Sequence, residues 1–91
     1  MTIYSLISKD EDAREILTYC ETPRSTDEII SHVYNIKRSK KPASYGDDQT
    51  VRTIVGSRLA KLESIKAIYF ENNMWVTSDT AKQILAKYFG L

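Results

Sequence analysis

The segment from residue 48 to residue 64 carries the side chains best suited to recognise another molecule. On a helical wheel its apolar residues form one arc, centred near Val51, Val55 and Leu62. The opposite side is small and polar: it holds Gln49, Thr53, Gly56, Ser57 and Ala60, with Thr50, Arg52 and Lys61 on its flanks. Gln pairs with the edge of adenine and Arg with that of guanine. The expected chemistry is hydrogen bonding to base edges in a DNA major groove, with Gln49 and Arg52 reading bases.

The same outer side of this predicted helix also carries hydroxyl and lysine side chains, which we expect to contact DNA. Small side chains let the helix backbone approach the groove, and hydroxyl groups bond either bases or phosphates. We therefore assign DNA contacts to Thr50, Thr53, Ser57 and Lys61 as well.

A basic run stands directly before this segment. Residues 36–66 hold eight Lys and Arg against three Asp and Glu, whereas residues 1–35 hold three against seven, although the net charge is only +1. Basic residues gathered in this way are typical of a phosphate-binding surface. The residues expected to clamp phosphates are Lys37, Arg38, Lys40, Lys41 and, beside them, Tyr45. Taken alone such a run is usually a solvated loop, but its place between two helices favours DNA contact.

The elements that position these residues follow from capping and periodicity. Capping boxes at Ser8 to Glu11 and at Ser25 to Glu28 each open a helix, and Thr22 and Pro23 end the first one. Two runs rich in β-branched and aromatic residues flank Asn72 and Asn73, which predicts a hairpin with positive φ at its turn. The predicted elements of a single domain, 1–91, are an N-terminal arm (1–8), helices at 9–21 and 25–35, a basic loop (36–47), a third helix (48–64), a hairpin (67–77) and a last helix (78–89).

The order of these elements resembles a winged helix-turn-helix. The run Arg58 to Glu63 followed by Ala67 and Ile68 looks like the end of a recognition helix and the first wing strand. Val76 and Thr77, with Ala81 and Leu85 after them, resemble the return strand and last helix of the multiple-antibiotic-resistance and arsenic-repressor families. Small winged-helix regulators of archaea and their viruses are similar. The resemblance covers roughly residues 10–89.

The resemblance implies a mainly helical α+β fold, with a three-helix core, a two-stranded wing and a C-terminal helix. It also implies transcription regulation. The chain departs from the pattern at Lys66, where the families usually have a glycine with positive φ, so we expect a rearranged turn into the wing. The wing tip, Glu71 to Asn73, carries no basic residue, and the connection from Ile36 to Gly46 is longer than a compact turn.

Several other polar residues have simpler structural explanations. Arg58 falls on the buried side of its helix, which favours a packed stem and a head paired to a carboxylate. His32 is expected at the surface or the core boundary, and Asp10 to Asp12 are expected to compensate a helix dipole. Cys20 is interpreted as a small core residue, with an intersubunit disulfide as the alternative. Tyr69 and Trp75 are expected to anchor the hairpin to the helices.

The sequence argues against enzymatic activity. It has no nucleophile and base pair, and with three glycines it has no loop to cradle phosphates. We therefore expect no catalytic residue, metal, cofactor or small-molecule substrate. No apolar stretch approaches the ~20 residues of a membrane span, and the first residues lack the features of a secretory signal. A cytoplasmic protein is expected, in the host cytoplasm if the chain is viral.

The apolar surface exceeds what so small a core needs. The apolar face of the last helix, with Ile3, Leu6, Ile7 and Phe89, predicts a homodimer. The function expected is sequence-specific binding of double-stranded DNA by a homodimeric transcription regulator. The alternative is a winged-helix protein-protein interaction module within a larger assembly, which the acidic first third of the chain and the acidic wing tip favour.

Overall fold

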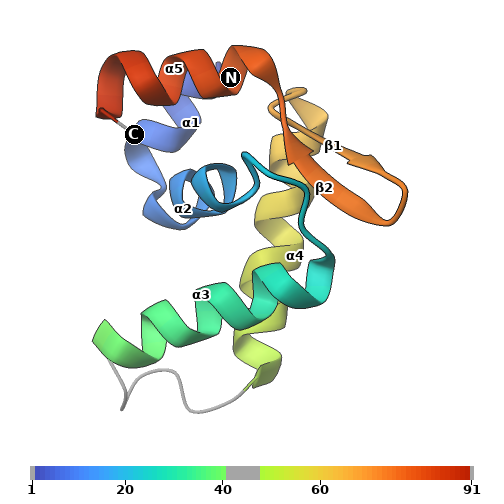
Figure 1. The fold of residues 1–91 in the computed structure, drawn as a ribbon. Coiled ribbons are helices and arrows are strands. Elements are labelled where there is room, and N and C mark those ends of the chain that lie inside the picture. The colour runs from blue at the N-terminus through green and yellow to red at the C-terminus, as the bar shows by residue number, and fades with distance from the viewer. Residues whose placement is uncertain (1, 41–47, 91) are drawn as a thin grey trace.

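The structure is a computed structural model that describes residues 2–40 and 48–90, with side chains described for 2–36 and 49–90. Within these residues the chain is mainly helical, with one antiparallel two-stranded sheet, as the sequence predicted for the α+β class (Figure 1). The elements are α1 (Ile3–Lys9), α2 (Glu11–Tyr19), α3 (Thr26–Lys40), α4 (Asp48–Ser64), β1 (Ile68–Glu71), β2 (Met74–Thr77) and α5 (Asp79–Phe89).

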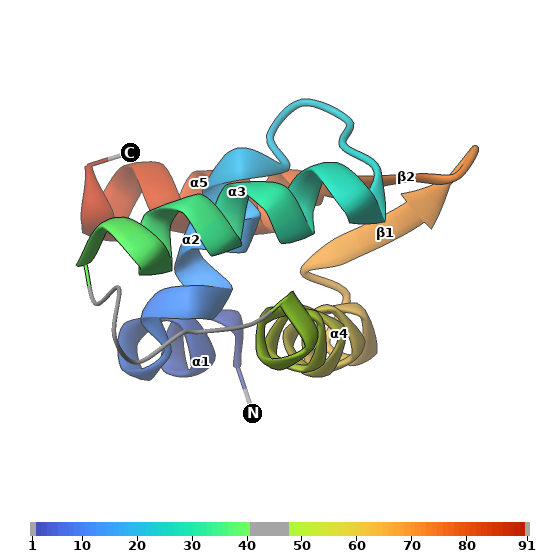
Figure 2. The same ribbon diagram turned by 90° about the horizontal axis from the view of Figure 1, so that it is seen from below.

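Helix α2 forms the centre of the molecule and contacts α1, α3, α4 and α5. Its residues Ala13, Ile16 and Leu17 are completely buried. Figure 2 shows α1 and α4 on one side of the molecule and α3 on the other. All of these elements share one hydrophobic core, to which α4 contributes Val51, Val55, Leu59 and Leu62. No helix among the described residues is long and apolar enough to cross a membrane.

The predicted N-terminal arm is wrong, because residues 3–9 form helix α1. The hydroxyl of Thr2 accepts a hydrogen bond from the Ser5 amide at 3.0 Å and so caps this helix. Leu6 and Ile7 are then buried on one face. The cap of α2 is Asp10, whose carboxylate accepts from the Ala13 amide at 3.1 Å, instead of the predicted box beginning at Ser8.

The second predicted capping box is confirmed. The Ser25 amide donates to the Glu28 carboxylate at 2.9 Å, and the Glu28 amide donates to the Ser25 hydroxyl at 3.2 Å. The first of these bonds lowers the pKa of Glu28 below its usual range, with the Ser25 hydroxyl and Arg24 adding to the effect.

Helix α3 is longer than predicted and ends at Lys40. The predicted loop 36–47 is therefore wrong for residues 36–40, and its remainder, 41–47, lies outside the described residues. The reason is that neither proline nor glycine occurs between Thr26 and Lys40 to interrupt the helix. The first proline after this stretch is Pro42, and a proline disfavours helical backbone at the residue before it.

The turn into the hairpin keeps its geometry although it has no glycine. Lys66 itself adopts a left-handed backbone, with φ 60°. The Ala67 amide bonds the Leu62 carbonyl at 2.9 Å and the Lys66 amide bonds the Glu63 carbonyl at 3.0 Å, which is the Schellman pattern of a helix end. The expected rearrangement of this turn is therefore wrong, because the lysine accepts the conformation that glycine would favour.

The hairpin turns at Asn72 and Asn73, whose φ angles of 52° and 62° confirm the predicted tight turn. Ile68 pairs with Thr77 and Phe70 with Trp75 in the antiparallel register. This hairpin follows α4 directly and projects from the molecule (Figure 2).

Two residues of β2 hold the hairpin to the helices. Trp75 exchanges main-chain hydrogen bonds with Arg24, at 3.1 and 2.6 Å, and its indole donates to the Thr26 hydroxyl at 2.9 Å. Thr77 bonds the end of α2, through its amide to the Cys20 carbonyl at 2.9 Å and through its hydroxyl to the Leu17 carbonyl at 2.6 Å. The anchoring role predicted for Trp75 is confirmed.

Tyr69, in contrast, is no anchor. It stays 46% exposed, and Ile68 fills the core position on β1. The expectation for Tyr69 is wrong because successive side chains of a strand point to opposite faces, and Ile68 occupies the face that meets the core.

Candidate nucleic-acid interface

The outer side of helix α4 is the candidate interface. Its buried residues lie on the face that the helical wheel predicted, with Val51, Val55 and Leu62 completely enclosed. The predicted contact residues on this helix are all exposed: Gln49, Thr50, Arg52, Thr53, Ser57 and Lys61. The structure thus brings these six residues together along one solvent-facing side of a single helix.

Gly56 stands in the middle of this outer side. A Cβ placed on it would meet no atom within 4 Å, so the helix backbone is open to solvent there. Its exposed neighbours Ser57 and Ala60 are also small. A flat stretch of this kind allows close approach by a rigid surface, such as the floor of a groove.

The predicted base-reading arginine lies within ion-pair distance of helix α3. Arg52 Nη1 lies 4.0 Å from the Asp27 carboxylate, in the first turn of α3, with the two side chains 49% and 89% exposed. So exposed a pair contributes little stability and yields easily to a stronger anion. The hydroxyl of Thr53 donates to the Gln49 carbonyl at 3.0 Å, and its oxygen keeps lone pairs to accept from a ligand.

Arg58 has the structural role that the sequence predicted. Its Nε lies 2.7 Å from the Asp10 carboxylate, an ion pair whose N–H is not aligned as a hydrogen bond, and both side chains are mostly buried. Because Asp10 also caps α2, this contact fixes α4 against the junction of α1 and α2. Arg58 is therefore part of the scaffold rather than of the outer side.

The basic run divides between helix and undescribed chain. Lys37, Arg38 and Lys40 lie near the end of α3, and their side chains are not described. Lys41 and Tyr45 lie outside the described residues. The end of α3 and the start of α4 both lie in the lower part of the molecule in Figure 1. Both ends therefore lie in the same part of the molecule, with the end of α3 at its left margin and the start of α4, which carries Gln49 and Arg52, to the right (Figures 1 and 2).

Two lysines outside the predicted contact set, Lys9 and Lys66, also lie near α4. Lys9, at the end of α1, and Lys61 border a surface depression of about 440 Å³ that also holds carboxylates, Asp10 to Asp12. Lys66 is exposed at the junction of α4 and the hairpin. The spacing of Ile3, Leu6 and Ile7 signals a helix, and recognising it would have placed Lys9 beside α4.

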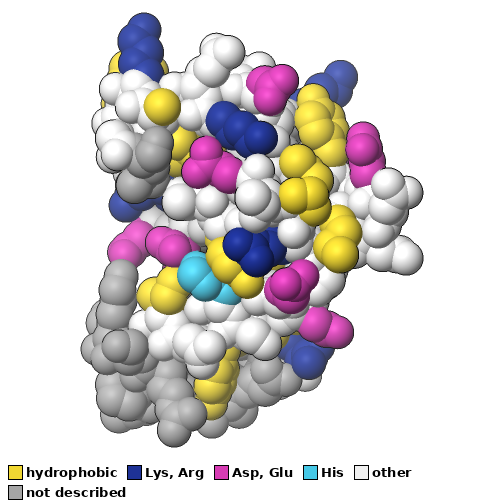
Figure 3. Space-filling view, viewed as in Figure 1, with side chains coloured by type: hydrophobic (Ala, Val, Ile, Leu, Met, Phe, Trp, Pro, Cys, Tyr) yellow, Lys and Arg dark blue, Asp and Glu magenta, His cyan; other side chains and the backbone are white. Residues whose placement is uncertain are grey.

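The opposite face of the molecule carries the histidine. His32 Nε2 lies 3.0 Å from the Glu15 carboxylate, and its ring stacks on Tyr19 with centroids 3.8 Å apart. The Arg24 guanidinium lies 4.2 Å from the same Tyr19 ring. Figure 3 shows this group as the cyan side chain beside hydrophobic and basic ones. His32 is partly buried, as predicted for a boundary position.

In the described part of the chain, neither His32 nor Cys20 is part of a candidate metal site. Among the described residues, no three His, Cys, Asp or Glu side chains are arranged to hold a metal ion. Cys20 is completely buried, as the core interpretation predicted, and this burial raises its pKa to about 12.

The chain was also compared with known proteins. No model of a protein family, no curated protein and no solved structure matches it.

Proposed function

We propose that this chain is a winged helix-turn-helix protein that binds double-stranded DNA as a homodimer and regulates transcription, with α4 in the major groove. The observation that carries the proposal is the outer side of α4. Six polar or basic residues are exposed along it around the open backbone at Gly56. A helix that docks into a groove of another protein presents a stripe of hydrophobic side chains. The exposed residues described on the outer side of α4 form no such stripe.

The arrangement around α4 supports the same proposal. A hairpin follows the helix directly, and its return strand is bonded to Arg24, just before α3. A winged helix-turn-helix has core helices followed by a recognition helix, a wing and a last helix, and the order of α2, α3, α4, the hairpin and α5 is compatible with it. In the proposed complex Gln49 and Arg52 contact base edges, while Thr50, Thr53, Ser57 and Lys61 contact bases or phosphates.

The basic run is assigned to the DNA backbone. Lys37, Arg38 and Lys40 near the end of α3, with Lys41 and Tyr45 after them, contact phosphates and fix the position of α4 without reading sequence. No residue is given a catalytic role, and no cofactor takes part.

The experiment is an anisotropy titration of the full chain with duplex DNA at several salt concentrations. We expect binding that weakens with salt, and a smaller salt dependence when Lys37, Arg38, Lys40 and Lys41 are all changed to Ala, by about 0.9 in log–log slope for each phosphate that is no longer neutralised. Lys61→Ala tests the outer side, and Lys82→Ala on α5 is its matched control. Equal affinity of the quadruple variant and the wild type, or no binding at low salt, would overturn the proposal.

A second candidate is a protein-interaction module, and the hairpin favours it. Phe70 and Met74 are 46% and 37% exposed, and the Phe70 ring lies 4.7 Å from that of Trp75. Hydrophobic side chains on the hairpin side are visible in Figure 3. Exposed apolar groups of this kind mark binding sites for other proteins. If the DNA titration fails, this surface becomes the leading candidate.

Selection of bound sequences from a random DNA pool would extend the main experiment. A homodimer predicts an inverted repeat with half-sites about one helical turn apart, ~34–36 Å. Enrichment of a single unrepeated site would contradict the homodimer while leaving DNA binding intact.

A further inference from the structure

Helix α5 presents a polar side on which its charges are placed symmetrically. Ala81 and Leu85 are completely buried, and Gln83 falls opposite them on the helix. Asp79 and Lys87 stand four residues before and four residues after Gln83, about 40° to either side of it around the helix. The exposed residues of this side are Asp79, Thr80, Gln83, Ala86 and Lys87, here called the α5 face.

This symmetry makes the α5 face complementary to a second copy of itself. When two identical helices pack antiparallel about a two-fold axis at Gln83, each Asp79 meets the other copy's Lys87, so two opposite-charge pairs form. Thr80 then faces Ala86, and these small residues let the helices approach closely. In the opposite, parallel orientation like charges would face each other, so the charges also fix the direction of packing.

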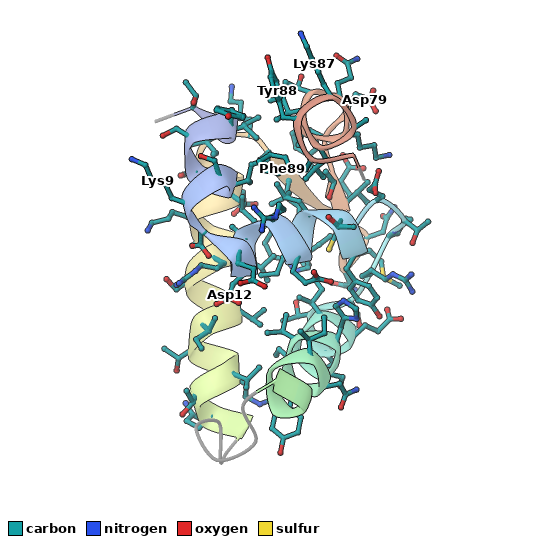
Figure 4. The ribbon with its side chains drawn as sticks, turned by 90° about the vertical axis from the view of Figure 1, so that its left-hand side faces the viewer. Lys9, Asp12, Asp79, Lys87, Tyr88 and Phe89 are labelled. Carbon is teal, nitrogen blue, oxygen red and sulfur yellow. The ribbon has the colours of Figure 1, made fainter. Side chains whose placement is uncertain are left out.

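Two exposed aromatic rings lie next to Lys87, on the side of α5 that meets α1. Tyr88 is 54% exposed and Tyr4 of α1 is 46% exposed, and their ring centroids lie 4.8 Å apart. Figure 4 shows Tyr88, Lys87 and Asp79 projecting outward from α5, and Phe89 lying toward α1. The Lys87 ammonium lies 5.3 Å from the Tyr88 ring. Aromatic side chains of this kind supply the apolar area that a charged face lacks.

We propose that a second copy of this chain docks on the α5 face, with the two α5 helices antiparallel, Asp79 paired to the partner copy's lysine, and Tyr4 and Tyr88 covered at the margin. The inference specifies the homodimer of the proposed function, but it does not depend on DNA binding. Helix α5 runs across the molecule, and α4 lies along one side of it (Figures 1 and 2). If the two-fold axis of the dimer points toward the side that carries α4, both copies of α4 lie on one common side of the dimer.

Sedimentation velocity of the full chain without DNA tests the proposal. We expect a dimer for the wild type, and weaker dimerisation, by about tenfold or more, for Asp79→Lys and for Lys87→Asp, because each change makes two attractive pairs repulsive. The double variant Asp79→Lys with Lys87→Asp restores both pairs and should dimerise within about threefold of the wild type. Lys82→Asp, on the flank of the same helix, is the matched control and should change dimerisation little.

Cross-linking tests the position of the axis separately. Gln83→Cys places a thiol beside its own counterpart, so mild oxidation should give a covalent dimer, whereas Ser31→Cys, exposed on α3, should not. Circular dichroism confirms that each variant is folded.

A monomeric wild type, a double variant that stays as weak as the single ones, or equal cross-linking at residues 31 and 83 would overturn the proposal. A monomer that still bound DNA would overturn this inference alone, and a dimer without DNA affinity would overturn only the DNA-binding proposal.

Discussion

The hydroxyl of Thr77 donates a hydrogen bond of 2.6 Å to the main-chain carbonyl of Leu17, and both residues are buried. The bond joins the end of the hairpin to the last turn of α2, where helix carbonyls lack partners within the helix. The carbonyl would otherwise be buried without a donor.

Thr77→Val therefore tests how strongly the hairpin is held. The valine keeps the shape but leaves the Leu17 carbonyl unpaired, so we expect a loss of about 1–3 kcal/mol in the free energy of unfolding, measured by urea denaturation. Thr77→Ser keeps the hydroxyl and should lose less. A Val variant as stable as the wild type would contradict the role of this bond.

Gly56 allows stability and binding to be separated. Because a Cβ there meets no atom, Gly56→Ala should stabilise the helix by about 1 kcal/mol in thermal unfolding. Gly56→Phe should also fold, since its ring extends into solvent. In the DNA titration, however, Phe should weaken binding by at least about tenfold, because it holds the backbone away from the groove. Unchanged affinity of the folded Phe variant would argue against contact through this side of α4.

Lys66 holds a backbone conformation that is unfavourable for any residue with a Cβ, by roughly 1–2 kcal/mol. Lys66→Gly removes this strain but adds about 0.5–1 kcal/mol of chain entropy to be lost on folding. We expect a net gain of up to about 1 kcal/mol for Gly. Lys66→Val should instead be less stable than the wild type, because branching at Cβ aggravates the strain. Melting temperatures in the order Gly, Lys, Val are expected, and any other order contradicts the argument.

Cys20 should resist thiol reagents in the folded protein. Burial raises its pKa to about 12 from its ordinary value of 9.0, so very little thiolate exists at mildly alkaline pH. We expect reaction with an aromatic disulfide reagent to be at least about a hundredfold slower than in urea. The raised pKa also means that the stabilising effect of the neutral thiol is complete below pH 9.0 and is lost as the pH rises toward 12. Equal rates in buffer and urea would show that the sulfur is accessible.

The parts of the fold that local patterns determine were predictable. The buried side of α4, the hairpin turn at Asn72 and Asn73 and the capping box at Ser25 all depend on residues close in sequence. The paired role of Arg58 was also predictable from the wheel, although its partner Asp10 was not, since nothing local relates two residues so far apart in sequence.

Other features depend on tertiary contacts as well as on the spacing of residues. Helix α1 differs from the arm that the sequence predicts, because seven residues are marginal for an isolated helix and this one is stabilised by burial of Leu6 and Ile7. Lys66 stands where a glycine is expected, yet the two Schellman hydrogen bonds around it hold the left-handed turn at the end of α4. Of the candidate interface, the α4 residues followed from periodicity, whereas the ion pair of Arg52 with Asp27 depends on how two helices cross.

The bridge between Arg24 and Trp75 uses main-chain atoms alone. Every residue except proline brings the same amide and carbonyl to this position, so these two bonds do not depend on which side chains stand there. The exposed side chains of β1 take no part in this bridge, so substitutions there leave it intact. The surface of the hairpin can therefore be changed by substitution while its attachment to the helices is kept.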